Sequence, residues 1–496
     1  MSTGNLAFDS ALILSRFGLG GGPDGLKSLG NDPAAALKTE IAAGAPGLKS
    51  QSLPATPDLL RAYYIYEQAR KATRDKARSV DPKAPSDAAM AMAGDMSKDI
   101  PKDVMAAPEM TRKGKPANPA RPDEVRDLNP VREAFLAEVD ARFNQALRDP
   151  VVGFNERLVM FWTNHFCVSA DKNQIIRLLS GAYEREAIRP HIFGRFEDML
   201  KASATHPAML IYLDNHVSIG PNSRANRAGK RGLNENLARE ILELHTLGVD
   251  GGYSQADVTA FARVLTGWSV GRAQDPGSGQ FVFRPQAHEP GPQTVLGKTY
   301  SDGDEAQGLK VLSDLARHPK TAQHIAFKLA RHFLSDTPSN SAVGALRDSF
   351  IKTDGDLGAV SQTLIGLPEA LSPQTPKMRT PLEYLTALLR LTPAQAKPQM
   401  LVTALKAMGQ PLWEPGGPNG FSDLAATWAS PESLSTRLEL ANSFAEKMAP
   451  YYDAREVLEQ QLGPRLSEDT QRAVSRAESR AQGLSLAFLS PEFMRR

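Results

Sequence analysis

Thiols are almost absent from this 496-residue sequence, which contains one cysteine, Cys167. A single cysteine excludes a disulfide within the chain and every metal or iron–sulfur site that needs several thiolates. Nine histidines leave open a site built from imidazoles and carboxylates. Excess charge is absent as well, because 58 Lys and Arg against 56 Asp and Glu give a formal net charge of +2. So small a surplus argues against the electrostatic capture of nucleic acid.

Long apolar runs are also missing. The sequence never holds about 18 consecutive apolar residues, the length that a membrane-spanning helix needs. Residues 1–10 show no basic segment before an apolar stretch of signal-peptide length. We therefore expect no membrane span and a cytoplasmic chain, or a periplasmic or extracellular one if a signal has been removed or a partner assists export. Motifs for phosphate loops, zincins and nucleophile elbows are absent too, and no cofactor is predicted.

Helical periodicity dominates what is present, and it predicts a mainly α-helical fold: a large multi-helical body with a small β-hairpin insert near residues 280–300. Residues 1–80 are predicted to be N-terminal helices. Residues 81–127 are rich in proline, alanine and lysine and predict a disordered insertion, with an active-site lid as the alternative. The main body covers 128–496, with a motif-bearing region at 151–300 and C-terminal helices at 301–496.

The hairpin insert is predicted from two short apolar segments. Residues 281–284 and 294–296 read as strands, and the Pro/Gly-rich residues 288–292 could turn the chain between them. Just before this region, Ser254 and Asp257 have the spacing of a capping box, which predicts the start of a helix.

The richest segment for chemistry is the predicted helix at 234–247. At about 100° per residue, Asn236, Glu240 and Glu243 share one stripe beside an apolar stripe, so their carboxylates should be partly buried and their pKa values shifted. Glu235 precedes Arg239 by four residues, the favourable order for a helical ion pair. The alternative is a structural ion-pair ladder. A metal site of Glu240, Glu243 and His245 fails because His245 lies about 140–160° around the helix.

Three further segments end in polar residues that could face a cleft. Asn164 and His165 close one helix, and His165 could lie at a pocket rim or in the core. Asp214 follows the apolar residues 207–213, where it could cap the next element or act as an acid or base. His288 lies in the predicted turn. Trp162 and Trp268 could stack on a sugar ring, although such residues are more often core.

Several of these motifs resemble a large bacterial family catalogued as a domain of unknown function, number eighteen hundred. The match covers nearly the whole chain except the insertion, and the segments that carry it are residues 16–20, 161–166, 189–194, 206–215, 234–248 and 253–268. His288 and Leu296-Gly297 fit a later motif, although Glu289 and Gln293 stand where relatives often have Asp and Lys. The family has no assigned activity. Its members often accompany a sulfatase-like family exported by the twin-arginine route, which implies a partner of that kind and points to extracellular polymers.

We therefore expect a hydrolase acting on a bacterial polysaccharide or oligosaccharide. Cleavage of a glycosidic bond needs two carboxylates in one cleft. The catalytic candidates are Glu235, Glu240 and Asp214. The candidates for substrate binding are Trp162, Asn164, His165, Asn234, Asn236, Arg239, Trp268 and His288.

Two other functions stay open. The first is a hydrolase that depends on a divalent metal, held by His165, His288, Asp214 and a glutamate of the helix. The second is a helical binding or assembly protein without enzymatic activity, in which the acidic helix is a structural network.

Overall fold

The computed structural model describes residues 3–22, 24–30, 32–45, 47–48, 53–80, 129–148, 151–227, 232–275, 277–301, 303–372, 377–391 and 396–496. The predicted insertion at 81–127 lies outside these residues.

Most of the described chain is helical, as the sequence predicts; η2 and η6 are π-helical and the other η segments are 3₁₀ turns. Up to the first strand, the helices are α1 (Thr3–Arg16), η1 (Gly25–Leu29), α2 (Pro33–Ala43), α3 (Thr56–Val80), α5 (Pro130–Arg148), α6 (Phe154–His165), α7 (Gln174–Tyr183), η2 (Glu184–Ile188), η3 (Arg189–His191), α8 (Phe196–Thr205), α9 (Pro207–Tyr212), η4 (Asn215–Val217), η5 (Arg224–Asn226), α10 (Asn236–Glu240), η6 (Ile241–Thr246) and α11 (Gln255–Val264).

Four short strands follow α11 and precede the C-terminal helices. The strands are β1 (Trp268–Val270), β2 (Phe281–Phe283), β3 (Gln293–Val295) and β4 (Lys298–Tyr300). The helices after them are α12 (Glu305–Ala316), α13 (Pro319–Phe333), α14 (Asn340–Lys352), α15 (Leu357–Ile365), η7 (Pro368–Leu371), α16 (Pro381–Arg390), α17 (Pro398–Ala407), α18 (Ala425–Trp428), α19 (Pro431–Met448), α20 (Ala454–Leu462), η8 (Gly463–Arg465), α21 (Glu468–Ser475), α22 (Arg480–Phe488) and α23 (Pro491–Met494). None of the described helices is long and apolar enough to cross a membrane.

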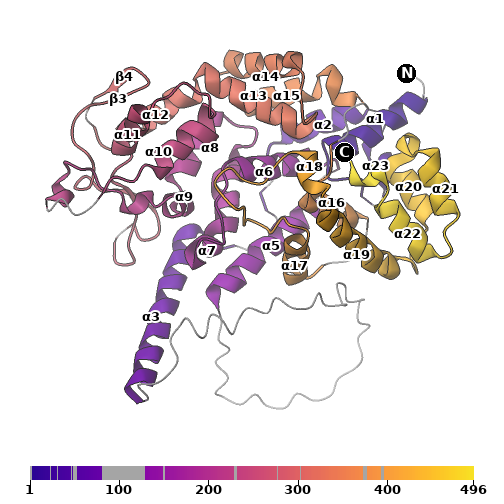
Figure 1. The fold of residues 1–496 in the computed structure, drawn as a ribbon, viewed down its shortest axis with the longest axis horizontal. Helices are drawn as coiled ribbons and strands as arrows, with labels where there is room; N and C mark the ends of the chain where they lie inside the picture. The colour runs from indigo at the N-terminus through magenta and orange to yellow at the C-terminus, as the bar shows by residue number, and fades with distance from the viewer. Residues whose placement is uncertain are drawn as a thin grey trace.

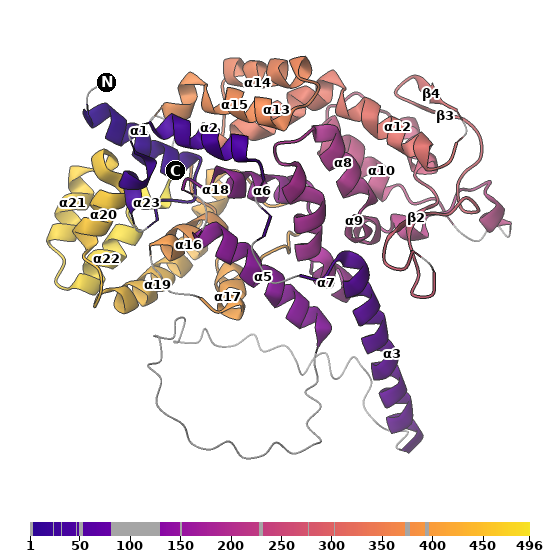
Figure 2. The ribbon, with the colours of Figure 1, turned by 180° about the vertical axis from the view of Figure 1, so that it is seen from behind.

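The two ends of the chain lie side by side (Figures 1 and 2). Helix α1 packs against η7 and η8, while α19 to α22 pack on one another beside it. The strands and α10 to α12 occupy the opposite end of the molecule, and α3 projects from the body between them. The N-terminal helices therefore contact the C-terminal helices directly.

Apolar side chains gather in two cores. The larger core contains Phe154, Trp162 and Trp268 and joins the N-terminal helices to α6 through α15. The smaller core contains Trp413 and Phe444 and is formed by α5 and the helices from α16 onward.

The strands β2 and β3 lie where the sequence predicts them, but their predicted pairing is wrong, and β1 and β4 were not predicted. Residues 281–283 pair with β1 rather than with residues 293–295, and β3 pairs with β4. The reason lies in the second turn, where Leu296 and Gly297 both adopt positive φ and close a two-residue hairpin from Val295 to Lys298. That turn pairs β3 with the strand that directly follows it.

Capping explains several helix starts. The predicted box is confirmed, since the Ser254 hydroxyl accepts from the Asp257 amide while the Asp257 carboxylate accepts from the Ser254 amide. Thr380 and Glu383 form a second box at the start of α16. Each box satisfies two backbone amides that have no partner inside the helix.

Two helical segments change winding partway along. Residues 174–188 are α-helical as far as Tyr183 and then π-helical, and the predicted helix at 234–247 becomes π-helical at Ile241. In the second segment the Leu247 amide donates to the Leu242 carbonyl, five residues back. Such segments are uncommon and occur frequently at functional sites.

A buried ion network joins the two cores. The Glu383 carboxylate accepts Arg157 at 2.5 Å and Arg496 at 2.9 Å, and all three side chains are at most 5% exposed. Arg157 also donates to Nε2 of His332 at 3.2 Å, so the Nδ1 proton of His332 is directed to the Asp423 carboxylate at 2.7 Å. Burial opposes ionisation of Glu383, but Arg157 and Arg496 outweigh it and lower the pKa of its carboxyl to about 2.

Replacement of Glu383 by Gln should destabilise the fold by about 3–5 kcal/mol, because it leaves two buried guanidinium groups without their counter-charge. The free energy of unfolding in urea measures this loss. Glu432→Gln, at an exposed position of α19, is the matched control and should stay within about 0.5 kcal/mol of the parent. Equal stability of the two variants would show that the network contributes little.

Candidate functional site

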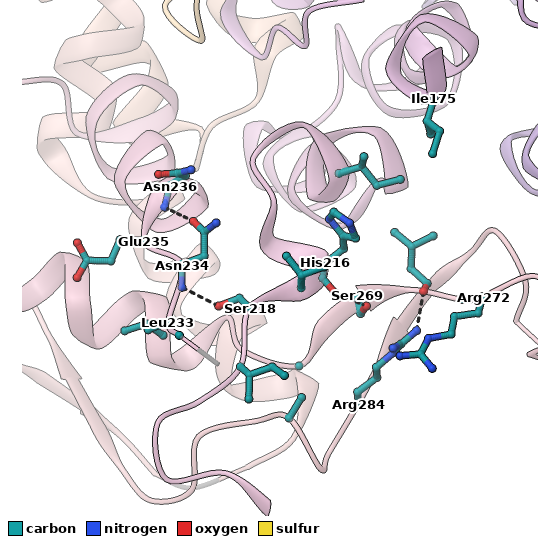
Figure 3. A pocket seen from close by; sticks show the side chains of 18 of the residues that line it. Ile175, His216, Ser218, Leu233, Asn234, Glu235, Asn236, Ser269, Arg272 and Arg284 are labelled. Carbon is teal, nitrogen blue, oxygen red and sulfur yellow. Dashed lines mark hydrogen bonds between the residues drawn. The ribbon is translucent and has the colours of Figure 1, made fainter. Parts of the chain in front are cut away.

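A cleft of about 1030 Å³ opens at the end of the molecule that carries the strands. Its walls come from α3, the start of α7, the end of α9, residues 216–219, residues 232–236 and the β1–β2 hairpin. Figure 3 shows most of these side chains. Among the described lining residues, the groups that ionise near neutral pH or carry charge are His216, Glu235, Arg272 and Arg284.

One wall is the segment that leads into α10. The Asn234 amide donates to the Ser218 hydroxyl at 3.0 Å, and the Asn236 amide donates to the Asn234 side chain at 2.9 Å. Both bonds are drawn in Figure 3. They anchor the loop just before α10, so Asn234, Glu235 and Asn236 are held together along the cleft.

Glu235 is held in place by donors from two helices. Its carboxylate accepts from Thr259 at 2.7 Å, from Gln255 at 2.8 Å and from Arg239 at 3.1 Å. The bonds from Thr259 and Gln255 are the main reason that the pKa of Glu235 is lowered. In Figure 3 the carboxylate points away from the His216 side chain. Glu235 is therefore ionised and fixed at the edge of the cleft.

Glu240 lies in a different environment, although it belongs to the same helix. The residue is half-buried, and its carboxylate makes no hydrogen bond or ion pair with another described residue. Burial and the nearby Glu243 raise its pKa. Glu240 follows Glu235 by five residues, which places it about 140° around the helix. It is not among the described residues that line the cleft.

Asp214 is near the cleft, but its carboxylate is engaged elsewhere. The residue adopts the left-handed conformation, with φ of 56°, and its side chain binds Lys172 Nζ at 2.7 Å. Its backbone carbonyl accepts a hydrogen bond from the side-chain Nδ2 of Asn234 at 3.5 Å. The structure thus brings the three candidate acids into one region without gathering their carboxylates in one space.

The other predicted binding residues are packed inside the protein, apart from Arg239, which binds Glu235 and Gln255. Trp162 and Trp268 are at most 1% exposed and belong to the larger core. Asn164 exchanges two hydrogen bonds with the Phe421 backbone, at 2.9 and 2.8 Å. In this structure these side chains support the cleft from behind.

The two predicted histidines are also buried. His165 Nε2 donates to the His245 carbonyl at 3.1 Å, and His288 Nδ1 donates to the Thr266 carbonyl at 2.9 Å. Each ring therefore uses one nitrogen to fix the backbone of a neighbouring segment.

A different histidine reaches the cleft. His216 Nδ1 donates to the Leu210 carbonyl at 3.2 Å, and the Ser269 hydroxyl donates to the His216 carbonyl at 2.8 Å. These bonds fix the orientation of the His216 ring. Its other nitrogen, Nε2, has no hydrogen-bond partner among the described residues. Burial lowers the pKa of His216 below its usual 6.5. The sequence signal was the position of His216 directly after Asp214 and Asn215, at the end of an apolar helix.

Two arginines of the hairpin complete the cleft and were also missed. Arg272 lies two residues after β1, and Arg284 directly follows β2. Arg284 donates to the Val270 carbonyl at 2.9 Å, as drawn in Figure 3. A correct strand pairing would have brought them together, because β1 and β2 are neighbours.

Behind α10, a group of histidines binds the π-helical segment. His324 Nε2 donates to the Leu244 carbonyl at 3.2 Å, as His165 does to that of His245. Burial lowers the pKa of His245 to about 3 and that of His324 to about 4. The signal in the sequence is the polar spacing of four in α13, at His324, Lys328 and His332.

In the part of the chain that the structure describes, no group of three or more His, Cys, Asp or Glu side chains is placed to hold a metal ion. His165, His288 and Asp214, which the metal-dependent alternative combines, bind three separate partners.

Comparison with known proteins gives one match. A family model described as a protein of unknown function, DUF1800, matches residues 12–495. No curated protein and no solved structure matches the chain.

The buried histidines predict a loss of stability in mild acid. His245, His324 and His332, with folded pKa values of about 3, 4 and 4 against about 6.5 when unfolded, are neutral in the folded protein. Between pH 6.5 and 4 the unfolded chain binds more protons, so the free energy of unfolding falls as pH falls, by up to ~1.4 kcal/mol per pH unit for each histidine. Urea unfolding at pH 7, 6 and 5 measures the slope. His324→Asn should lower this slope by the contribution of about one proton taken up on unfolding. An unchanged slope would contradict the assignment of a neutral, buried His324.

Proposed function

The chain belongs to the DUF1800 family, whose description names no activity, and we propose that it is a hydrolase acting on a glycan bound in the cleft. The size of the cleft, about 1030 Å³, supports this, because ligand sites commonly enclose roughly 300–1,000 Å³. Its lining combines amides, hydroxyls and apolar side chains, which suits the hydroxyl groups and the apolar faces of sugar rings. The partner from the sulfatase-like family and the cellular compartment stay predictions.

The observation that carries the proposal is the state of Glu235. Three side-chain donors hold its carboxylate ionised and in a fixed orientation beside the cleft. A carboxylate in this state can accept a proton from the attacking water or stabilise positive charge on the sugar ring. Rigid support from α11 provides the positioning that such a role needs.

His216 is the second group of the proposed reaction. Its ring is oriented by the bond to the Leu210 carbonyl, and the imidazole lines the cleft. In its protonated form it donates a proton to the oxygen of the leaving sugar, so that the glycosidic bond breaks as water adds to the ring carbon. His165 and His288, which the sequence predicts to bind substrate, are buried and do not line the cleft.

Binding without hydrolysis is a second candidate, favoured by one specific observation. Glu235 is the sole carboxylate among the described lining residues, whereas most glycoside hydrolases use two. In that case the cleft retains a glycan and releases no reducing ends.

Glu235→Gln should reduce the release of reducing ends from a susceptible glycan by about 10²–10⁴-fold, because the variant cannot accept a proton. The matched control is Glu240→Gln on the same helix, which should keep its activity. It should also be at least as stable as the parent, since its raised pKa shows that the folded state disfavours the charged form. A loss of activity in Glu240→Gln alone would show that the reaction takes place on the face of α10 that carries Glu240, outside the cleft. Tight binding with no release in any variant would favour the binding function.

The pH profile of kcat/KM should be bell-shaped and centred in mild acid. Activity should fall below about pH 4.5 as Glu235 takes up a proton, since its pKa is lowered from 4.5, and it should fall again as pH rises past a value below about 6.5, where His216 loses its proton. His216→Gln should lower the activity and remove the alkaline limb. A parent profile that is flat from pH 5 to 8 would contradict the role of His216.

A further inference from the structure

Two guanidinium groups of like charge meet on one wall of the cleft. Arg272 follows β1 by two residues and Arg284 directly follows β2, and Figure 3 shows their side chains converging. Burial, together with the charge of Arg272, lowers the pKa of Arg284. Two cations placed so close repel each other, and the arrangement is unfavourable unless an anion lies between or beside them.

The protein supplies little negative charge of its own here. Asp275 is the acid that pairs with Arg284, at 3.7 Å, and its side chain is 43% exposed. One of its oxygens already accepts from the Arg272 backbone amide at 2.9 Å. The Arg272 guanidinium makes no hydrogen bond or ion pair with another described residue, so the pair keeps donors free for a ligand.

The guanidinium of Arg284 is held in place by a hydrogen bond to the backbone. Its side chain is 28% exposed and is tied to the Val270 carbonyl, which holds the guanidinium against the cleft wall. Glu235 lies on another wall, on the loop that enters α10. A ligand that bridges the two walls would therefore carry its negative charge at the hairpin end and away from the carboxylate.

We propose that Arg272 and Arg284 form a subsite for the oxyanion groups of a glycan, so that the substrate class is an acidic polysaccharide that carries carboxylates or sulfates. This proposal rests on the proposed function. Guanidinium groups suit the role because their planar N–H donors bind both oxygens of such a group at once. The cleft volume of about 1030 Å³ exceeds that of a single sugar ring, and the arginine pair then selects the acidic sugars.

The experiment measures binding of the full chain by affinity electrophoresis, with polygalacturonate, dextran sulfate or neutral dextran in the gel. The Glu235→Gln background prevents cleavage during the run. The double variant Arg272→Gln/Arg284→Gln is compared with the control Arg347→Gln/Arg472→Gln, which removes the same charge from exposed positions elsewhere. We expect binding at least about tenfold weaker in the first and unchanged in the second. The carboxylated and sulfated probes decide which oxyanion is recognised.

Equal weakening in both double variants, or equal binding of dextran and the acidic probes, would overturn the proposal. The single variant Arg272→Gln changes an exposed side chain and guards against misfolding of the double variant. Arg272→Lys/Arg284→Lys keeps the charge and should lose part of the affinity, because lysine lacks the paired donors. If acidic probes bind through the arginines but no glycan is hydrolysed, the subsite stands and the hydrolase proposal fails. If a neutral glycan is hydrolysed without dependence on the arginines, the hydrolase proposal stands and the subsite proposal fails.

Discussion

Two arginines share one buried carboxylate, and this contact holds together α6, α16 and the C-terminal end of the chain. Glu383 lies at the start of α16, Arg157 comes from α6, and Arg496 from the end of the chain. Charges removed from water are stable only when they are closely paired, so these segments can meet in very few arrangements. His332 extends the contact to α13 and to Asp423.

Helix α6 connects the Glu383 network to the cleft. Arg157 fixes one end of the helix, and His165 at its other end binds the carbonyl of His245. The π-helical segment continues directly from α10, and the loop that enters α10 carries the cleft-wall residues Asn234 and Glu235. The cleft is thus built on an exposed loop but supported by buried ionic and polar contacts. Such supporting contacts hold the residues of a site in a fixed geometry.

The sequence predicted those features that depend on local rules. Helical periodicity located most helices, and the Ser254 capping box marked a helix start. These signals arise within a few residues of the chain, so they can be read without knowing the tertiary contacts. The positions of β2 and β3 were predicted for the same reason.

The remaining features depend on contacts between distant residues. The tight turn at Leu296 and Gly297 pairs β3 with β4, so β2 pairs with β1 instead. The pairing of β1 with β2 places Arg272 and Arg284 on one wall of the cleft. Trp162 and Trp268 resemble stacking residues in the sequence, but only the packed core shows that their faces are covered. His216 and His165 are both histidines at helix ends, and no local pattern states which of them reaches the solvent.

The π-helical winding of η6 also bears on how this chain can change in length. A loop of π hydrogen bonds contains one residue more than an α-helical loop, so loss of a single residue from 241–246 would regularise the helix rather than break it. All cleft residues of this segment, up to Asn236, come before the π winding and would keep their places. The carbonyls that His165 and His324 hold would rotate away from them. The segment is therefore where a one-residue deletion would spare the cleft wall while uncoupling it from the core.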